Sequence, residues 1–336
     1  MANLTENEIA FPNLGIDRIT IDSAAIKFGD FSIAWYGIII VFGMMLAIIF
    51  GMKQMKKFGV SSDRAFDAIL GGIIGGLIGA RLYFVFMNWD DYKKEPLQIL
   101  NIRQGGLAIY GGIIGALLVG IIICRIRKVK LLPLFDIVGM GFLIGQGIGR
   151  WGNFCNQEAF GCNTDLPWGM TGGKIQAWIR AQHSLGNLGD VSADKLVHPC
   201  FLYESIWCLI GFLVIFLISK HRKYDGQLFL LYVFWYGVGR AFIEGLRTDS
   251  LMAGNIRVSQ MLAIVSAIAA FILLIVAGSK VKRLGPDYVF YKDTDESKEF
   301  IRMEEENEEK SKKKKTDKTE KSETDKEEKT EENKAE

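Results

Sequence analysis

The sequence predicts an all-α polytopic membrane protein with seven transmembrane helices. Apolar segments recur near residues 33–50, 65–87, 106–124, 134–149, 200–219, 227–246 and 258–279. Each is close to the ~20 residues that a helix needs to cross a bilayer. The composition agrees, because 49% of the 336 residues are hydrophobic and 37 are glycine.

Basic clusters follow every odd-numbered segment and give the predicted orientation. They lie at Lys53–Lys57, Arg125–Lys130, Lys220–Lys223 and Lys280–Arg283. Loops rich in Lys and Arg stay on the cytoplasmic side of a membrane. We therefore expect the N-terminus outside and the C-terminus in the cytoplasm. Residues 150–197, rich in Gly, Asn and Asp, then form a small extracellular head between the fourth and fifth helices.

Three regions follow from this pattern. Residues 1–32 are predicted to be an extracellular lead-in, 33–285 the membrane domain, and 286–336 a charged, disordered cytoplasmic tail. A solvated, charge-laced helix is the alternative for the tail. Residues 293–336 hold 18 acidic and 12 basic residues, so the remaining chain carries a net charge of +8. Bases concentrated in a few loops indicate contact with anionic lipid rather than nucleic acid.

Glycines in the second and third segments recur every four residues. Gly71, Gly75 and Gly79 form one series, and Gly111 and Gly115 another. Small residues at this spacing allow helices to approach closely in lipid, so we expect these glycines to serve helix packing.

The stretch with the most polar chemistry is GQGIGRWGNFCNQEAFG at residues 145–161. A charge near the middle of a bilayer costs roughly 2.5–3.5 kcal/mol on insertion scales, so such residues usually have a function or a partner. Arg150, Asn153 and Gln157 share one face if the stretch is helical. That face offers a fixed cation and neutral hydrogen-bonding groups, which suits an anion.

The sixth segment also carries polar and charged residues on one face of an apolar helix. Tyr236, Arg240, Glu244 and Arg247 fall on one helical face, which must point toward protein or a wet cavity. Glu244 is a candidate partner of either arginine.

Other polar residues stand in or beside the predicted helices and have open interpretations. Arg81 is a further buried cation. Tyr36 is either an aromatic residue at the membrane interface or a site residue. His198, Tyr203 and Glu204 either form structural hydrogen bonds or take part in the chemistry. Cys155, Cys162 and Cys200 fall on the outer side, but spacing alone does not show a disulfide.

These residues carry a family resemblance. The chain resembles the prolipoprotein diacylglyceryl transferases of bacteria. The similar segments run in family order and span about residues 30–280: GARLYF at 79–84, GGLAIYGG at 105–112, GRWGNFCNQEAFG at 149–161, HPCFLYE at 198–204 and YGVGRAFIEGLR at 236–247. The charged tail lies outside the resemblance.

The resemblance implies a reaction in the bacterial cytoplasmic membrane, with the active site toward the outer face. A diacylglyceryl group passes from phosphatidylglycerol to the lipobox cysteine thiol of a prolipoprotein, and glycerol-1-phosphate leaves. Cations fixed beside the leaving phosphate stabilise its growing charge. Arginine suits this because its planar fork binds phosphate oxygens in pairs. No metal or other cofactor is implied.

The resemblance also implies site residues. We expect Arg150 and Arg240 to hold the phosphate, with Asn153 and Glu158 shaping the site. The motif match adds Gly161, Tyr236 and Tyr36 as expected substrate-binding residues. Arg81, Glu204 and Arg247 are further candidates for substrate binding.

One position departs from the family pattern. Many members have His where this chain has Tyr110, and that histidine is often given the role of base. A tyrosine, with a pKa of ~10, is a poor base at neutral pH. One alternative is that Tyr110 donates a hydrogen bond to the phosphate or to an acyl ester. The other is that the thiol loses its proton to the leaving phosphate.

Three other classes of protein are less consistent with the sequence. A transporter is disfavoured because no internal repeat and no matched pair of interrupted helices is visible. A structural lipid-binding protein does not need polar stripes at the outer ends of two helices. An intramembrane protease requires paired carboxylates or a spacing such as HExxH, which is absent from the sequence.

Overall fold

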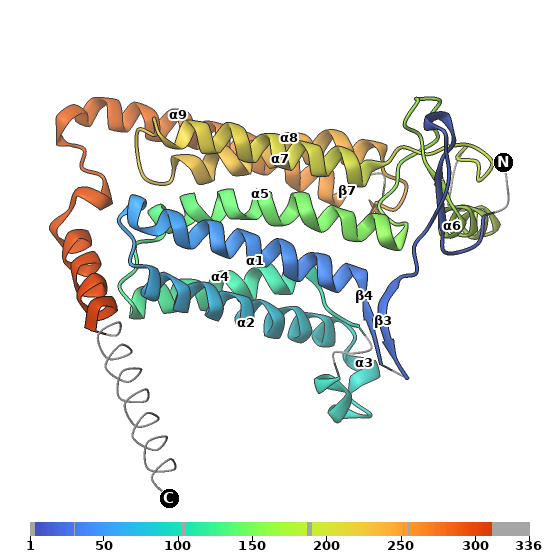
Figure 1. The fold of residues 1–336 in the computed structure, drawn as a ribbon, viewed down its shortest axis with the longest axis horizontal. Helices are drawn as coiled ribbons and strands as arrows, with labels where there is room; N and C mark the ends of the chain where they lie inside the picture. The colour runs from blue at the N-terminus through green and yellow to red at the C-terminus, as the bar shows by residue number, and fades with distance from the viewer. Residues whose placement is uncertain are drawn as a thin grey trace, which may run out of the picture. The chain divides into compact units, whose positions relative to one another are not determined.

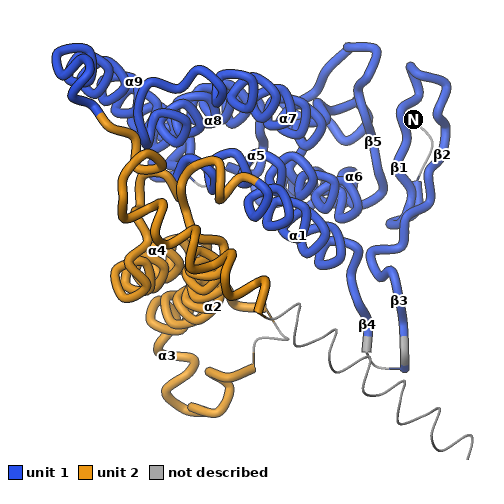
Figure 2. Tube along the Cα trace, turned by 60° about the vertical axis from the view of Figure 1, so that its left-hand side comes forward, with its two compact units in different colours: residues 1–53, 135–288 blue, residues 54–134, 289–336 orange. Residues whose placement is uncertain are grey.

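A computed structural model describes residues 4–29, 31–101, 105–186, 190–250, 252–254 and 256–310. The chain divides into two compact units (Figure 2). Unit 1 comprises residues 1–53 and 135–288, and unit 2 comprises residues 54–134 and 289–336.

Within the described residues, seven helices are long and apolar enough to cross a membrane, which confirms the predicted fold class. They are α1 (Trp35–Met55), α2 (Ser62–Met87), α4 (Ile109–Ile126), α5 (Leu131–Asn156), α7 (Cys200–Ser219), α8 (Gln227–Leu246) and α9 (Val258–Leu284). The protein is therefore a multi-pass membrane protein. The largest difference in bounds is at α5, which continues past the predicted end at residue 149 to Asn156.

Unit 1 contains most of the long helices, and Figure 1 shows them running alongside one another. Helix α8 packs against both α7 and α9. Glycine allows α1 to approach α5, since a Cβ on Gly43 would lie 3.2 Å from Ile148 and 3.3 Å from the carbonyl oxygen of Gly145.

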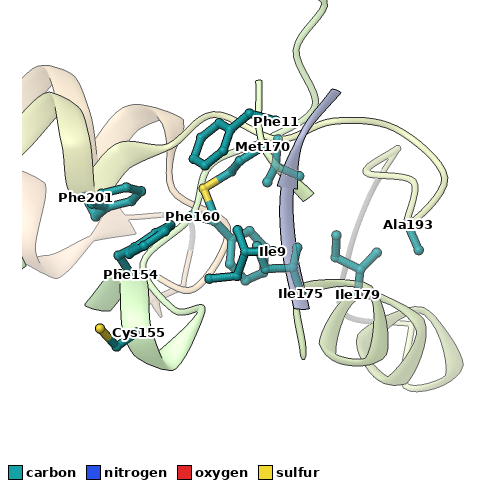
Figure 3. Packing of buried hydrophobic residues seen from close by; sticks show 11 residues of the cluster. Ile9, Phe11, Phe154, Cys155, Phe160, Met170, Ile175, Ile179, Ala193 and Phe201 are labelled. Carbon is teal, nitrogen blue, oxygen red and sulfur yellow. The ribbon is translucent and has the colours of Figure 1, made fainter. Parts of the chain in front are cut away.

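A small head is built on the same unit, and the N-terminal segment is part of it. Strand β1 (Glu8–Phe11) lies between β2 (Ile16–Thr20) and β5 (Thr171–Gly172) in an antiparallel sheet. Helix α6 (Gly173–Ser184) follows β5 directly. Apolar side chains from these elements and from the ends of α5 and α7 form one buried cluster, which includes Ile9, Phe154, Ile175 and Phe201 (Figure 3). The N-terminal lead-in thus contributes strands to the head, which sequence analysis did not predict.

Two further strand pairs lie in unit 1. Strands β3 (Ala24–Phe28) and β4 (Phe31–Ala34) form a hairpin that leads into α1, and β6 (Met252–Ala253) pairs with β7 (Ile256–Arg257) before α9.

The predicted position of Gln157 on a helical face is wrong. Gln157 does not share a helical face with Arg150, because its positive φ of 57° ends α5 at Asn156. Its amide instead donates to the carbonyl oxygen of Glu6 at 2.6 Å and accepts from the amide of Lys174 at 2.9 Å. Gln157 therefore ties the N-terminal segment to the start of α6.

In unit 2, α2 and α4 pack closely through the predicted glycine series. A Cβ on Gly75 would lie 2.8 Å from the carbonyl oxygen of Gly115, and one on Gly79 would lie 2.9 Å from the Cα of Gly115. Any side chain at these positions would push the two backbones apart, so these glycines serve helix packing as the spacing predicted, and the structure shows that α2 and α4 are the partners. The short helix α3 (Trp89–Tyr92) and a 3-10 turn at Pro96–Leu100 follow α2.

Residues 286–310 differ from the prediction of disorder. Residues 295–310 are helical, and they dock on unit 2 rather than standing free in solvent. The Ser297 hydroxyl donates to the carbonyl oxygen of Gly59 at 2.7 Å, and Glu304 accepts from the backbone amide of Ser62 at 2.9 Å. Ion pairs Lys56–Glu305 at 3.5 Å and Lys130–Glu296 at 3.1 Å add to the contact. The predicted tail beyond residue 310 lies outside the described residues.

The contact from Glu304 yields a stability prediction. Its carboxylate, 4% exposed, caps the first turn of α2 from outside that helix. We expect Glu304→Ala to lower the free energy of unfolding by about 1 kcal/mol, measured by thermal unfolding in detergent. Glu306→Ala, on the exposed face of the same helix, is the matched control and is expected to have little effect. Equal losses in both variants would contradict the capping role.

Candidate active site

Three helices of unit 1 bring the predicted arginines together on one carboxylate. Glu204, in the first turns of α7, receives Arg150 from α5 on its Oε1 and Arg240 from α8 on its Oε2, the latter at 2.9 Å. The Tyr236 hydroxyl, one turn before Arg240, donates to the same Oε1 at 3.3 Å. The two guanidinium groups therefore converge on Glu204, which lies between them.

Burial separates the acids from the bases in this cluster. The side chains of Glu204 and Glu244 are 3% and 2% exposed, whereas those of Arg150 and Arg240 are 18% and 14% exposed. The carboxylates are thus more deeply buried than the arginines that pair with them. A buried carboxylate that holds an arginine in place also limits its side-chain freedom, so little reorganisation is needed when an anion arrives.

The cluster continues along α8 and just beyond its end. Arg240 also pairs with Glu244 at 2.5 Å, so both candidate partners predicted for Glu244 are near it, with Arg247 at 3.9 Å. Arg247 forms a bidentate pair with Asp249, both N···O distances being 2.9 Å. Tyr236, Arg240 and Glu244 therefore lie within α8, whereas Arg247 follows its last residue, Leu246, with an extended backbone.

Polar residues at the end of α5 extend the cluster toward the head. Asn153 accepts from Arg150 at 3.3 Å and donates to Glu158 at 2.9 Å. Asn156 donates to the same oxygen of Glu158 at 3.3 Å. Because the chain reverses after Asn156, the Glu158 amide also donates to the Asn153 carbonyl oxygen at 3.0 Å, which folds the carboxylate back over the helix end.

Interhelical hydrogen bonds set the positions of α7 and α8, and the sequence analysis missed them. The Trp207 indole donates to the Trp235 carbonyl oxygen, and the Trp235 indole donates to that of Trp207, both at 2.9 Å. The rings stack with centroids 4.5 Å apart, and Gly211 and Gly239 leave the space for them. The signal in the sequence is a Trp followed four residues later by Gly in both helices.

Helix α7 is tied to α5 as well. The Ser205 hydroxyl, next to Glu204, donates to the carbonyl oxygen of Gly147 at 2.7 Å. Gly147 precedes Arg150 by less than one helical turn, so this bond fixes the level at which the first arginine meets Glu204.

Gly161 and Tyr36 lie where the elements around the site pack closely. A Cβ on Gly161 would lie 2.8 Å from His198 Cβ and 2.9 Å from Cys200 Sγ, so only glycine fits there. Tyr36 covers Gly152 on α5, where a Cβ would lie 2.7 Å from its ring.

His198 accepts from or donates to the Tyr203 hydroxyl at 3.1 Å, and burial lowers the pKa of its imidazole below the usual value. Cys155, Cys162 and Cys200 are free thiols.

Arg81 and Tyr110 belong to unit 2, and Arg81 has partners of its own. Its guanidinium donates to backbone carbonyl oxygens at 2.7–3.0 Å, those of Gln98, Ile99, Asn101, Gly105 and Gly106. Arg81 therefore holds the loop between α2 and α4, and a headgroup would have to displace these bonds to reach it. Tyr110 lies in the first turn of α4 and is 37% exposed.

The fold and the site together define a class of protein. It is a multi-pass membrane protein whose buried polar centre presents two converging arginines, an arrangement suited to an anionic group that enters from the lipid. The comparisons with known proteins identify the class further.

The sequence model of the prolipoprotein diacylglyceryl transferase family matches residues 23–276. The chain is 41% identical to the phosphatidylglycerol–prolipoprotein diacylglyceryl transferase of Limosilactobacillus reuteri over 271 residues, which cover 80% of this chain and 95% of that protein. It is 40% identical to the enzyme of the same name from Clostridioides difficile over 261 residues, covering 78% and 97%. The chain belongs to the prolipoprotein diacylglyceryl transferase family, and it is an enzyme of that transferase class.

The shared carboxylate gives a second stability prediction. Glu204→Gln keeps the shape of the side chain but leaves two arginines without their common counter-charge. We expect a loss of about 2–3 kcal/mol in unfolding free energy, since breaking a buried pair costs 3–5 kcal/mol and these arginines are partly exposed. Thermal unfolding in lipid nanodiscs measures it.

Glu158→Gln is the matched control for that measurement, because its carboxylate is exposed and binds only neutral amides. A Glu204→Gln variant as stable as Glu158→Gln would contradict the bridging role.

Proposed function

We propose that this chain transfers the diacylglyceryl group of phosphatidylglycerol to the lipobox cysteine of a prolipoprotein, and that Arg150 and Arg240 carry the catalysis. The family membership supports the reaction. The observation that carries the assignment of residues is the convergence of the two guanidinium groups on Glu204.

The reaction sets what the site has to supply. The cysteine thiolate attacks the glycerol carbon that carries the phosphate ester, so a C–S bond forms as the C–O bond breaks. Glycerol-1-phosphate leaves with the bonding electrons, and its phosphate goes from a monoanion toward a dianion. The thiol proton passes to a base or to the leaving phosphate. A free cysteine with a pKa of ~8.5 is only a few per cent ionised at pH 7, so both ends of the displacement need assistance.

The arginines act on the leaving group. Their exposed edges bind the phosphate oxygens, and the interaction strengthens as the second negative charge develops. Glu204 orients both guanidinium groups from behind, and Tyr236 supports that carboxylate. Asn153 and Glu158 shape the side of the site nearest the head, while Gly161, Tyr36 and Arg247 hold its walls.

We assign no residue of unit 1 as the general base that takes the thiol proton. In this proposal Tyr110 donates a hydrogen bond to the substrate, and the proton leaves with the phosphate. Arg81 acts on the loop that leads to Tyr110, because its partners Gly105 and Gly106 shortly precede that residue.

We place the enzyme in the bacterial cytoplasmic membrane with the site toward the outer face. The cluster forms at the ends of α5 and α8 and the start of α7, whereas Lys220–Lys223 follow the opposite end of α7. The positive-inside rule puts that basic loop in the cytoplasm and hence the cluster near the outer surface.

The proposal predicts a strong loss of transferase activity when either arginine is replaced by lysine. Lysine keeps the charge but not the paired geometry, so Arg150→Lys and Arg240→Lys should each lower kcat by about 10²–10³-fold. Release of glycerol phosphate from phosphatidylglycerol vesicles, with a lipobox peptide as acceptor, measures it. Near-normal turnover in both variants would remove the arginines from the mechanism.

Tyr110 gives a separate prediction. Tyr110→Phe should lower kcat by about 10-fold or more through loss of one hydrogen bond to the substrate. Tyr110→His should remain active and gain an ionisation near pH 6.5 in its pH–rate profile, with activity falling as the imidazole is protonated. Wild-type rates in the Phe variant would exclude Tyr110 from the chemistry.

A further inference from the structure

A carboxylate that the proposed mechanism does not use is buried near the start of α5. Asp136 is 0% exposed. It lies on α5, 14 residues before Arg150, and is therefore far from the cluster around Glu204. A charged side chain within a membrane span is costly, and such residues usually have a specific partner.

The partner of Asp136 is the start of another helix. Its Oδ2 accepts from the backbone amide of Gly226 at 2.8 Å, and its Oδ1 accepts from that of Phe229 at 2.9 Å. Gly226 is the N-cap of α8 and has no side chain to cap the helix itself. Asp136 therefore supplies the cap from α5 and meets the positive end of the α8 dipole.

This contact sets the register of the two helices that bear the arginines. Arg150 follows Asp136 by 14 residues, and Arg240 follows Gly226 by 14. Both helices run away from the contact in the same direction, so both arginines lie about 21 Å along their helices from it. Equal distances from a shared contact bring the two guanidinium groups to the same level, where Glu204 binds them.

Packing between the two ends transmits the register. A Cβ on Gly139 would lie 3.2 Å from Tyr232 Cβ and 3.4 Å from Phe229 Cα, so α5 and α8 touch closely just beyond the contact. Further along, the Gln146 amide donates to the Tyr232 hydroxyl at 3.1 Å. The helices thus touch at several points between Asp136 and the turn before Arg150, including the rings of Phe142 and Tyr232 with centroids 5.8 Å apart, and these contacts couple the two ends.

We propose that Asp136 is a positioning residue for the transfer reaction, which fixes the level of Arg240 relative to Arg150 through the first turn of α8. This inference rests on the proposed roles of the two arginines. A displacement of about 1 Å at catalytic groups costs up to about 10²-fold in rate, so the expected effect is on kcat although Asp136 touches no substrate.

Two variants test the register. Asp136→Asn keeps one acceptor but turns an amide toward the second backbone N–H. Asp136→Glu keeps both acceptors and the charge but adds about 1.5 Å between the helices. We expect both to lower kcat for glycerol phosphate release by about 10–100-fold, with KM for phosphatidylglycerol within about 3-fold of wild type, below the unfolding temperature of each variant.

Tyr224→Phe is the matched control, because it removes a 3.3 Å hydrogen bond to the carbonyl oxygen of Leu274 at the same end of α8 and leaves both hydrogen bonds of Asp136 in place. Its kcat should stay within about 3-fold of wild type, as a lost neutral hydrogen bond costs only a little stability.

The outcomes separate this inference from the proposed function. If Asp136→Glu folds with a wild-type kcat, the register role is overturned, and Asp136 is only a helix cap. The same conclusion follows if Asp136→Asn lowers only the unfolding temperature and keeps a wild-type kcat in the folded protein. A wild-type protein that releases no glycerol phosphate contradicts the proposed function itself.

Discussion

The bond on which the site depends is the shared ion pair of Glu204 with Arg150 and Arg240. Two like charges on separate helices repel each other in a medium of low dielectric constant. One buried carboxylate between them makes their convergence stable in the absence of a ligand. In the proposed mechanism, the same carboxylate means that an arriving phosphate meets arginines that are already oriented.

The rest of unit 1 holds this ion pair in place. In lipid there is no hydrophobic force between helices, so packing and interhelical hydrogen bonds determine their register. Asp136 joins α5 to α8, Ser205 joins α7 to α5, and the Trp207–Trp235 pair joins α7 to α8. Each pair of the three site helices therefore has a polar connection of its own.

Much of the fold was predictable because long apolar runs in a membrane allow little else than helices. The glycine series in α2 and α4 indicated close helix packing, because small residues let backbones approach, but it did not indicate which helices are partners. The N-terminal strands escaped prediction because β1 is short and pairs with β5, some 160 residues away. A charged helix was the alternative predicted for the tail, but the docking of residues 295–310 was not predicted, since their charged composition is typical of solvated segments and their few buried groups, such as Ser297, give no periodic signal.

The site was predictable as a set of residue types but not as an arrangement. Arg150 and Arg81 look alike in sequence as buried cations beside polar motifs. Only the structure separates them, since one pairs with Glu204 and the other is surrounded by the carbonyl oxygens of its own loop. Likewise, a helical face through Gln157 was a fair expectation until the positive φ at that residue ended the helix.

The most direct test of the central claim is an experimental structure of the enzyme with phosphatidylglycerol bound. The account predicts phosphate oxygens within about 2.7–3.2 Å of guanidinium nitrogens of both Arg150 and Arg240, with Glu204 still behind them. A headgroup bound away from this pair, or in contact with only one of the two arginines, would contradict it.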